Sequence, residues 1–199
     1  MSKGRLEAFS DGVMAIIITI MMLELHAPHE PTLEAIANLV PELLGYVLSF
    51  VFIAIYWNNH PHMLQAVRHV TGRVLWANMH LLFWLSLVPF ATHWMGRTNF
   101  APLPVAAYGV VLLLAACAYT ILSRVLIAAH GQDSALAIAV GGDGKGKLSL
   151  LLYAAAVGLA FVHPWIACGL YAVVAIIWLV PDRRIEKTLS RKHESGQPA

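Results

Sequence analysis

The sequence predicts an all-α integral membrane protein with six transmembrane helices, and three observations lead to that fold class. Hydrophobic residues make up 59% of the chain and charged residues only 12%, whereas soluble proteins average about 45–50% and 25%. The mean hydropathy is +0.68. The apolar residues form long runs separated by loops that contain proline, glycine or charged residues. We therefore treat residues 1–199 as a single transmembrane domain with a basic tail at 181–199.

The first predicted helix covers residues 5–26 and is almost wholly apolar after its first turns. At a rise of about 1.5 Å per residue, 21 of these residues span about 31 Å, enough to cross a hydrocarbon core of about 30 Å. Glu7 and Asp11 interrupt its start, and the run is longer than the apolar part of a typical signal peptide. We expect this helix to be retained as a membrane span.

Proline and glycine divide the rest of the chain. Pro28 and Pro31 end the first helix, so that 26–38 is expected to be a loop. The glycine-rich stretch 130–147 is interpreted as a flexible linker, because no strand precedes it to build a phosphate loop. Further helices are predicted at 41–61, 72–95, 105–129, 148–162 and 164–180.

Positive charges are distributed unequally in this layout. Of the 13 Lys and Arg residues, only Arg97 falls in a loop on the far side of the membrane from the termini. Cytoplasmic loops carry an excess of Lys and Arg, which predicts a multi-pass protein of the plasma (inner) membrane with both termini in the cytoplasm. No basic patch with interleaved aromatic residues indicates nucleic-acid binding. Cys117 and Cys168 lie in apolar runs and are interpreted as small hydrophobic residues.

The first helix carries a narrow apolar stripe. A helical wheel places Ile16, Ile20 and Leu23 within about 60° of one another, with Gly12 and Thr19 at the edge of the stripe. The stripe has two interpretations. It is either an ordinary packing face or a surface that copies of the chain share around an axis.

Polar side chains gather toward the cytoplasmic ends of the first three helices. Ser10 and Asp11 begin the first helix, His60 ends the second, and Asn78 and His80 lie early in the third. Such groups are costly inside a bilayer unless they are paired, which favours an interhelical hydrogen-bond network. Ser10 as a helix N-cap and a proton relay through these groups are alternatives. No nucleophile lies beside an oriented base and the histidines are scattered, so neither an enzyme nor a metal site is predicted.

Several motifs resemble the transmembrane protein 175 family of potassium channels. They are RLEAFSD at 5–11, LEL at 23–25, YWNNH at 56–60, WANMHLLF at 76–83 and LVPFAT at 87–92. Together they cover roughly the first half of the chain. The resemblance implies a potassium-permeable channel of four six-helix subunits, because the animal members of that family carry two such repeats per chain.

In the channel interpretation, copies of the first helix present Ile16, Ile20 and Leu23 as a hydrophobic constriction that can gate by dewetting. One helix cannot enclose a pore, so a homo-oligomer is required, and the resemblance implies a homotetramer. The sequence has no Thr-Val-Gly-Tyr-Gly filter. A preference for potassium would then come from its lower dehydration cost, with Thr19 hydroxyl groups nearby. Potassium, the bilayer and other copies are the expected partners, and no cofactor is expected.

Three charged or aromatic residues of the motifs have open roles. Arg5 can pair with Asp11 or lie in the positive inner interface, and Phe9 belongs to the signature. Glu24 can attract cations at the outer mouth or extend toward interfacial water. The alternative function is a proton- or cation-coupled secondary transporter that uses the Asp11 and His80 region, although broken helices and internal repeats are not evident.

Overall fold

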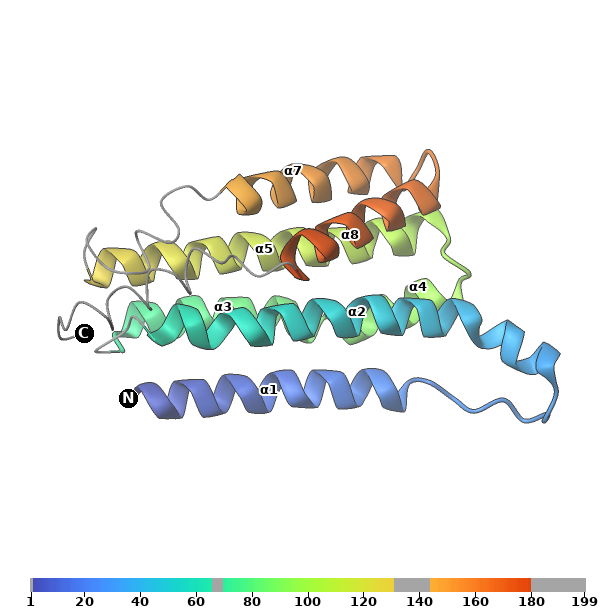
Figure 1. The fold of residues 1–199 in the computed structure, drawn as a ribbon, viewed down its shortest axis with the longest axis horizontal. Helices are drawn as coiled ribbons and strands as arrows, with labels where there is room; N and C mark the ends of the chain where they lie inside the picture. The colour runs from blue at the N-terminus through green and yellow to red at the C-terminus, as the bar shows by residue number, and fades with distance from the viewer. Residues whose placement is uncertain (1, 66–69, 131–143, 180–199) are drawn as a thin grey trace, which may run out of the picture.

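The computed structural model describes residues 2–65, 70–130 and 144–179. Within these ranges seven α-helices form six segments, because α3 and α4 follow one another across a single residue. Neighbouring segments run in opposite directions along the bundle (Figure 1). The predicted all-α fold with six membrane segments is confirmed. The helices are α1 (Lys3–Leu23), α2 (Leu33–Gln65), α3 (Gly72–Ser86), α4 (Val88–Arg97), α5 (Pro102–His130), α7 (Gly144–Leu159) and α8 (Pro164–Leu179).

Length and composition mark the chain as a multi-pass membrane protein. Four stretches among the described residues are long and apolar enough to cross a bilayer, namely 3–23, 33–64, 72–97 and 102–129. The helices α7 and α8 have 16 residues each, which gives about 24 Å of helix. Large apolar side chains such as Phe83 and Phe90 point outward, as expected for a surface in contact with lipid.

The second helix is longer than predicted. The structure starts α2 at Leu33 rather than at residue 41, because the Thr32 hydroxyl accepts a hydrogen bond from the backbone N–H of Ala35 at 3.2 Å and so caps the helix. Pro41 and Pro61, which were expected to bound the helix, lie inside it. A proline inside a helix removes one backbone donor and bends the axis. Figure 1 shows α2 changing direction near its start.

The third predicted helix, 72–95, is divided into two. α3 ends at Ser86 and α4 begins at Val88, with Leu87 between them. Pro89 has no backbone N–H for the carbonyl of Leu85, and its ring crowds that carbonyl, which explains the interruption. The predicted segment is thus one apolar span, Gly72–Arg97, with a break at Leu87.

The C-terminal half differs from the prediction mainly at one helix end. α7 begins at Gly144, so Gly144–Lys147 are helical instead of belonging to the predicted linker. The rest of that linker at 131–143 and the basic tail at 181–199 lie outside the described residues. α7 and α8 form the expected hairpin, with the turn at 160–163.

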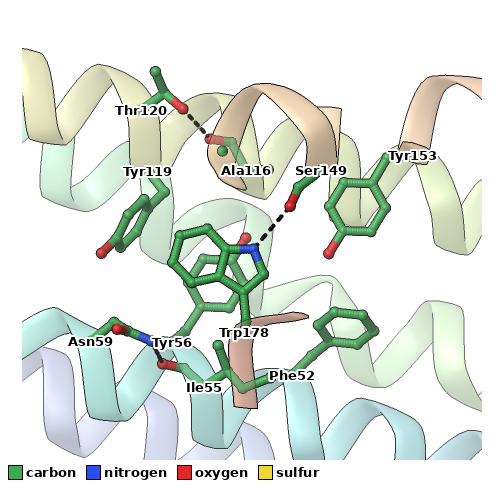
Figure 2. Close-up of a pocket in the computed structure, with 11 residues that line it drawn as sticks. Phe52, Ile55, Tyr56, Asn59, Ala116, Tyr119, Thr120, Ser149, Tyr153 and Trp178 are labelled. Carbon is green, nitrogen blue, oxygen red and sulfur yellow. Dashed lines mark hydrogen bonds between the residues drawn. The ribbon is translucent and has the colours of Figure 1, made fainter. Parts of the chain in front are cut away.

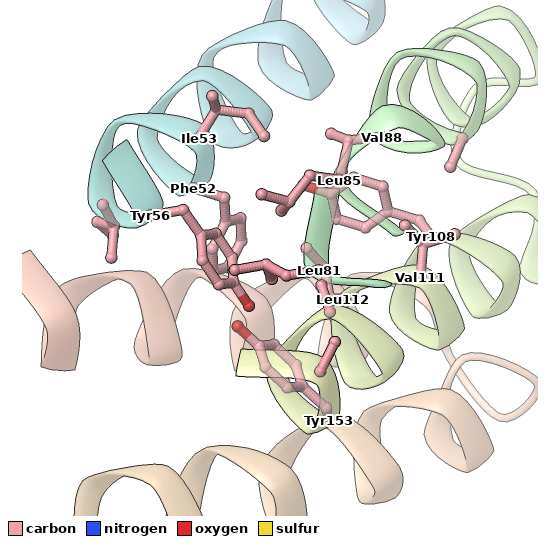
Figure 3. Close-up of a cluster of buried hydrophobic side chains, with 14 of the residues drawn as sticks. Phe52, Ile53, Tyr56, Leu81, Leu85, Val88, Tyr108, Val111, Leu112 and Tyr153 are labelled. Carbon is pink, nitrogen blue, oxygen red and sulfur yellow. The ribbon is translucent and has the colours of Figure 1, made fainter. Parts of the chain in front are cut away.

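The core lies between α2, α3, α5, α7 and α8, and α1 packs on one side of it against α2, α3 and α4 (Figure 1). Figure 3 shows aliphatic and aromatic side chains of α2, α3, α4, α5 and α7 meeting there. Buried alanines on α5, α7 and α8 let the backbones approach closely, which is how helices associate where lipid removes the hydrophobic driving force. The buried core includes Phe52, Tyr56, Leu81, Leu85, Tyr108, Leu112, Ala115, Tyr153, Ala156 and Tyr171.

One glycine of α5 allows the closest approach to α8. A Cβ atom added to Gly109 would collide with the hydroxyl of Tyr171, which donates a hydrogen bond to the carbonyl of Val105 at 3.1 Å. We expect Gly109→Ala to lower the free energy of unfolding by about 1–3 kcal/mol, because the Tyr171 ring must move and its hydrogen bond is lost. Thermal unfolding of the purified protein in detergent measures this change. Gly169→Ala on α8 is the control, since nothing lies within 4 Å of an added Cβ, and equal destabilisation by both variants would contradict the packing.

Candidate functional site

The first helix presents one face to its own bundle. Its buried side chains follow one another at intervals of four, four, three and four residues, which places them on a single side of the helix. Each of them is at most 3% exposed. The complete set is Leu6, Ser10, Met14, Ile17 and Met21. This face holds α1 against α2, α3 and α4.

The predicted stripe lies on another side of α1 and is open. Ile16 is 58% exposed, Ile20 42% and Leu23 73%, whereas Ile17 is only 2% exposed. Thr19 is also exposed, and its hydroxyl donates to the carbonyl of Ala15 at 2.6 Å. No helix among the described residues covers this stripe. Among the described residues, this stripe is therefore not a packing face within one chain.

A chain of buried hydrogen bonds joins α1, α3 and α2. The Ser10 hydroxyl donates to the carbonyl of Leu6 at 2.8 Å, so its oxygen can accept from Nδ2 of Asn78 at 2.9 Å. Oδ1 of Asn78 then lies 2.7 Å from Nε2 of His60. Because an amide oxygen only accepts, Nε2 of His60 must be the donor. Each bond fixes the direction of the next, so the three helices are held in one register.

This chain brings together some of the residues predicted to form a network and leaves others out. Ser10 is the eighth residue of α1, and therefore cannot be its N-cap. Asp11 is half-buried, and its carboxylate has no hydrogen bond among the described residues. His80 is exposed, and its Nε2 accepts from Nε1 of Trp84 on its own helix at 2.9 Å. Its predicted place in the network is wrong because its position on α3 turns it away from Asn78, which is fully buried.

The remaining motif residues of α1 take different positions. Arg5 and Phe9 are exposed, and Arg5 forms no ion pair with Asp11 in the part of the chain that the structure describes. At the other end, Oε2 of Glu24 lies 3.2 Å from Nδ1 of His93 on α4. Glu24 thus has a partner within its own chain. No pattern in the sequence distinguished His93 from the other histidines.

A second chain of buried hydrogen bonds was not predicted from the sequence. Thr92 on α4 donates to the carbonyl of Val88 at 2.7 Å, and its oxygen lies 2.6 Å from the hydroxyl of Ser49 on α2. The hydroxyl of Tyr108 on α5 lies 3.0 Å from Ser49. All three side chains are buried. Hydroxyl groups inside apolar runs were the only available signal, and such residues also occur in helices where they bond only to their own backbone.

A cavity of about 50 Å³ lies between α2, α5, α7 and α8. Figure 2 shows the indole of Trp178 among the rings of Tyr56, Tyr119 and Tyr153. Nε1 of Trp178 donates to the Ser149 hydroxyl at 2.9 Å. Among the described residues, the lining of this cavity contains no charged side chain. Nor do three His, Cys, Asp or Glu side chains group to hold a metal ion among residues 2–65, 70–130 and 144–179.

The fold and these contacts define a multi-pass helical membrane protein whose first helix leaves an apolar face open. A family model described as "Endosomal/lysosomal potassium channel TMEM175" matches residues 5–89. The chain is 51% identical over 189 residues to a potassium channel of Chryseobacterium sp., covering 95% of this chain and 98% of that relative. The chain therefore belongs to the TMEM175 family, which confirms the resemblance.

Two further similarities extend this result. The crystal structure of a lysosomal potassium-selective channel TMEM175 homolog from Chamaesiphon minutus superposes with a TM-score of 0.76 at 28% identity, covering 89% of this chain and 96% of that one. The chain is also 33% identical over 103 residues to the endosomal/lysosomal proton channel TMEM175 of Gallus gallus, covering 46% of this chain and 21% of that protein. Because the Chamaesiphon structure covers 89% of this chain, the similarity of fold extends well into the C-terminal half.

Asn78 and His80 lie two residues apart on α3 and offer a matched test of the buried chain. We expect Asn78→Ala to lower the free energy of unfolding by about 1–3 kcal/mol, because it leaves Nε2 of His60 buried without a partner. His80→Ala should change it by less than about 0.5 kcal/mol, since His80 is exposed. Urea or thermal unfolding in detergent measures both. A larger loss for His80→Ala than for Asn78→Ala would show that the bonds do not hold these helices together.

Proposed function

We propose that this protein is a potassium-permeable cation channel in which α1 of each subunit lines a central pore. The observation that carries the proposal is the open stripe of α1, where Ile16, Ile20 and Leu23 are exposed while the adjoining face is buried in the subunit. In a membrane protein an apolar stripe can face lipid, other copies of the chain or a pore. The family resemblance favours the pore.

The proposed assembly is a homotetramer with α1 closest to the axis. Several copies are needed because a single helix cannot surround an ion path. The buried face of α1 packs against α2, α3 and α4, so each subunit can supply one α1 with its stripe directed away from the subunit. The small residue Gly12 and exposed Thr19 at the edge of the stripe leave room for close approach between copies.

Potassium is proposed as the permeant ion. The Chryseobacterium relative is named a potassium channel, and the Chamaesiphon structure is described as a homolog of a potassium-selective one. With no carbonyl filter in the sequence, selection would occur at the apolar neck, where potassium sheds water at a lower cost than sodium. Dewetting of the same neck would close the path. The name of the Gallus gallus relative makes protons a second permeant ion to test.

We propose that the protein lies in the plasma (inner) membrane. In the proposed orientation, both chain termini are in the cytoplasm. Support comes from the charges at the two ends of the bundle. Arg97, at the end of α4, lies at one end, whereas Lys3, Arg73 and Lys145, each at the start of a helix, lie at the other. This is the asymmetry that the positive-inside rule describes.

The transporter alternative depends on a joint site formed by Asp11 and His80. The structure does not favour it, because His80 bonds to Trp84 on the outside of α3 and Asp11 has no bond to that helix among the described residues. A pair of groups that binds a coupled ion would be expected to converge. We therefore keep the channel as the single proposed function.

Replacing Ile16 tests the pore assignment. We expect Ile16→Asn to raise basal cation flux and to reduce the preference for potassium over sodium, because a polar ring hydrates the neck. Flux into liposomes containing the purified protein, measured under potassium and sodium gradients, reports both effects.

The matched control is Ile18→Asn, two residues along the same helix. Ile18 packs against the core and is only half-exposed, so its replacement should disturb packing and lower the yield of folded protein without a change in ion preference. Indistinguishable fluxes from the two variants, each corrected for folded protein, would refute the assignment of the stripe to a pore.

A further inference from the structure

The cavity between α2, α5, α7 and α8 has walls built largely from aromatic rings. Five rings of the described residues line it, and their planes are tilted against one another (Figure 2). The ring of Tyr119 makes edge contacts with Tyr56 and Trp178, at centroid distances of 5.8 and 6.3 Å. The ring of Phe52 lies 6.2 Å from that of Tyr153, at an angle of 57°. The faces of such rings carry partial negative charge and so attract a positive group.

The other polar side chains of this lining already use their donors inside the protein. Nδ2 of Asn59 and the hydroxyl groups of Thr120 and Ser149 each donate to the backbone carbonyl four residues earlier, at 2.8 to 2.9 Å. Nε1 of Trp178 donates to the Ser149 hydroxyl at 2.9 Å. These bonds leave chiefly oxygen lone pairs for a molecule in the cavity. The rings and the lone pairs therefore both favour a positively charged donor.

Two tyrosine hydroxyl groups of the lining have no hydrogen-bond partner among the described residues. Tyr56 on α2 is only 9% exposed, and Tyr153 on α7 only 3%. Figure 3 shows the two hydroxyl groups pointing toward one another from their separate helices. Because buried polar groups are nearly always paired, two converging hydroxyl groups without a partner indicate that a further polar group fits between these helices.

We propose that this cavity binds the ammonium group of a primary alkylamine. Its volume of about 50 Å³ is about a third of the cavity of about 150 Å³ that takes benzene, so it suits a small group rather than a ring. A primary ammonium group carries three N–H donors. Two of them match the hydroxyl oxygens of Tyr56 and Tyr153, while the charge lies against the aromatic rings. A quaternary ammonium group has no N–H and cannot form these bonds.

This chemistry has two sources, a soluble alkylamine and the ethanolamine headgroup of a phospholipid. Lys145 and Lys147 flank Gly146, which belongs to the lining. Their positive charges oppose a lone ammonium ion, but they attract the phosphate that an ethanolamine lipid carries two carbons away from its nitrogen. We therefore expect the lipid headgroup to bind more tightly than the free amine. Binding at this site does not depend on whether α1 lines a pore.

Thermal unfolding of the purified protein in detergent tests the site, with ethylammonium chloride as the probe. At about 100 mM this salt should raise the midpoint of unfolding by about 2–4 °C relative to sodium chloride at the same concentration, because a ligand that binds the folded state stabilises it. Tetramethylammonium chloride should give less than about half of this shift. Equal shifts from the two ammonium salts would overturn the proposal. So would the absence of a shift from ethylammonium in detergent together with indifference to ethanolamine lipid, the result expected if water alone fills the cavity.

Phenylalanine substitutions separate the cavity from general effects of the salt. The double variant Tyr56→Phe with Tyr153→Phe keeps both rings and loses no hydrogen bond to the described residues, so it should fold. It should lose at least about half of the ethylammonium shift, because the two acceptor oxygens are gone. Tyr46→Phe, also on α2 but outside this lining, is the matched control and should keep the full shift. An undiminished shift in the double variant would show that the amine acts elsewhere and would overturn the site.

Reconstitution in lipid nanodiscs distinguishes the two sources. Replacing phosphatidylglycerol with phosphatidylethanolamine should raise the unfolding midpoint of the wild type by about 2–4 °C more than that of the double variant, and it should remove the further shift from ethylammonium chloride. A midpoint that ignores the ethanolamine lipid while ethylammonium keeps its shift would identify the free amine as the ligand and support the site. A midpoint that responds to neither would overturn the proposal.

Discussion

The need to pair polar groups inside a membrane explains how this subunit is held together. Hydrocarbon offers no hydrogen bonds, so a buried donor or acceptor is stabilised only by a partner within the protein. Ser10, Asn78 and His60 form such bonds across α1, α3 and α2. Together the bonds constrain the relative position of the three helices. Because Ser10 accepts from Asn78, the rotation of α1 about its axis is set as well, and that rotation decides which residues of α1 are left open.

The two faces of α1 follow from this fixed rotation. Met14 and Ile17 turn into the subunit, and Ile16 and Ile20 turn out of it. A second chain of bonds through Ser49, Thr92 and Tyr108 holds α4 and α5 to α2 in a similar manner. The scaffold is thus stiff next to α1, while the far end of α1 has one polar side-chain contact to α4 among the described residues. A pore-lining helix needs this combination, because its position must be defined and yet able to change at the constriction.

Much of the fold and part of the site could be predicted from the sequence. Apolar runs of membrane length, the wheel position of Ile16 and the polar residues Ser10, His60 and Asn78 were all readable, because periodicity and the cost of buried polar groups act locally. The predicted start of α2 was wrong because Pro41 was taken to begin the helix, whereas the structure has this proline inside it. His80 and His93 could not be distinguished by sequence. Which of them has a partner in another helix depends on how the helices pack, and a single sequence does not show this.

The most direct test of the account is the location of α1 in the assembled protein. A structure of the purified oligomer in lipid, determined with potassium present, would show which helix lies nearest the symmetry axis. We expect four subunits, with Ile16, Ile20 and Leu23 forming the narrowest part of a central path and the Ser10, Asn78 and His60 bonds intact within each subunit. An assembly in which the stripe of α1 faces lipid at the periphery would contradict the proposed pore.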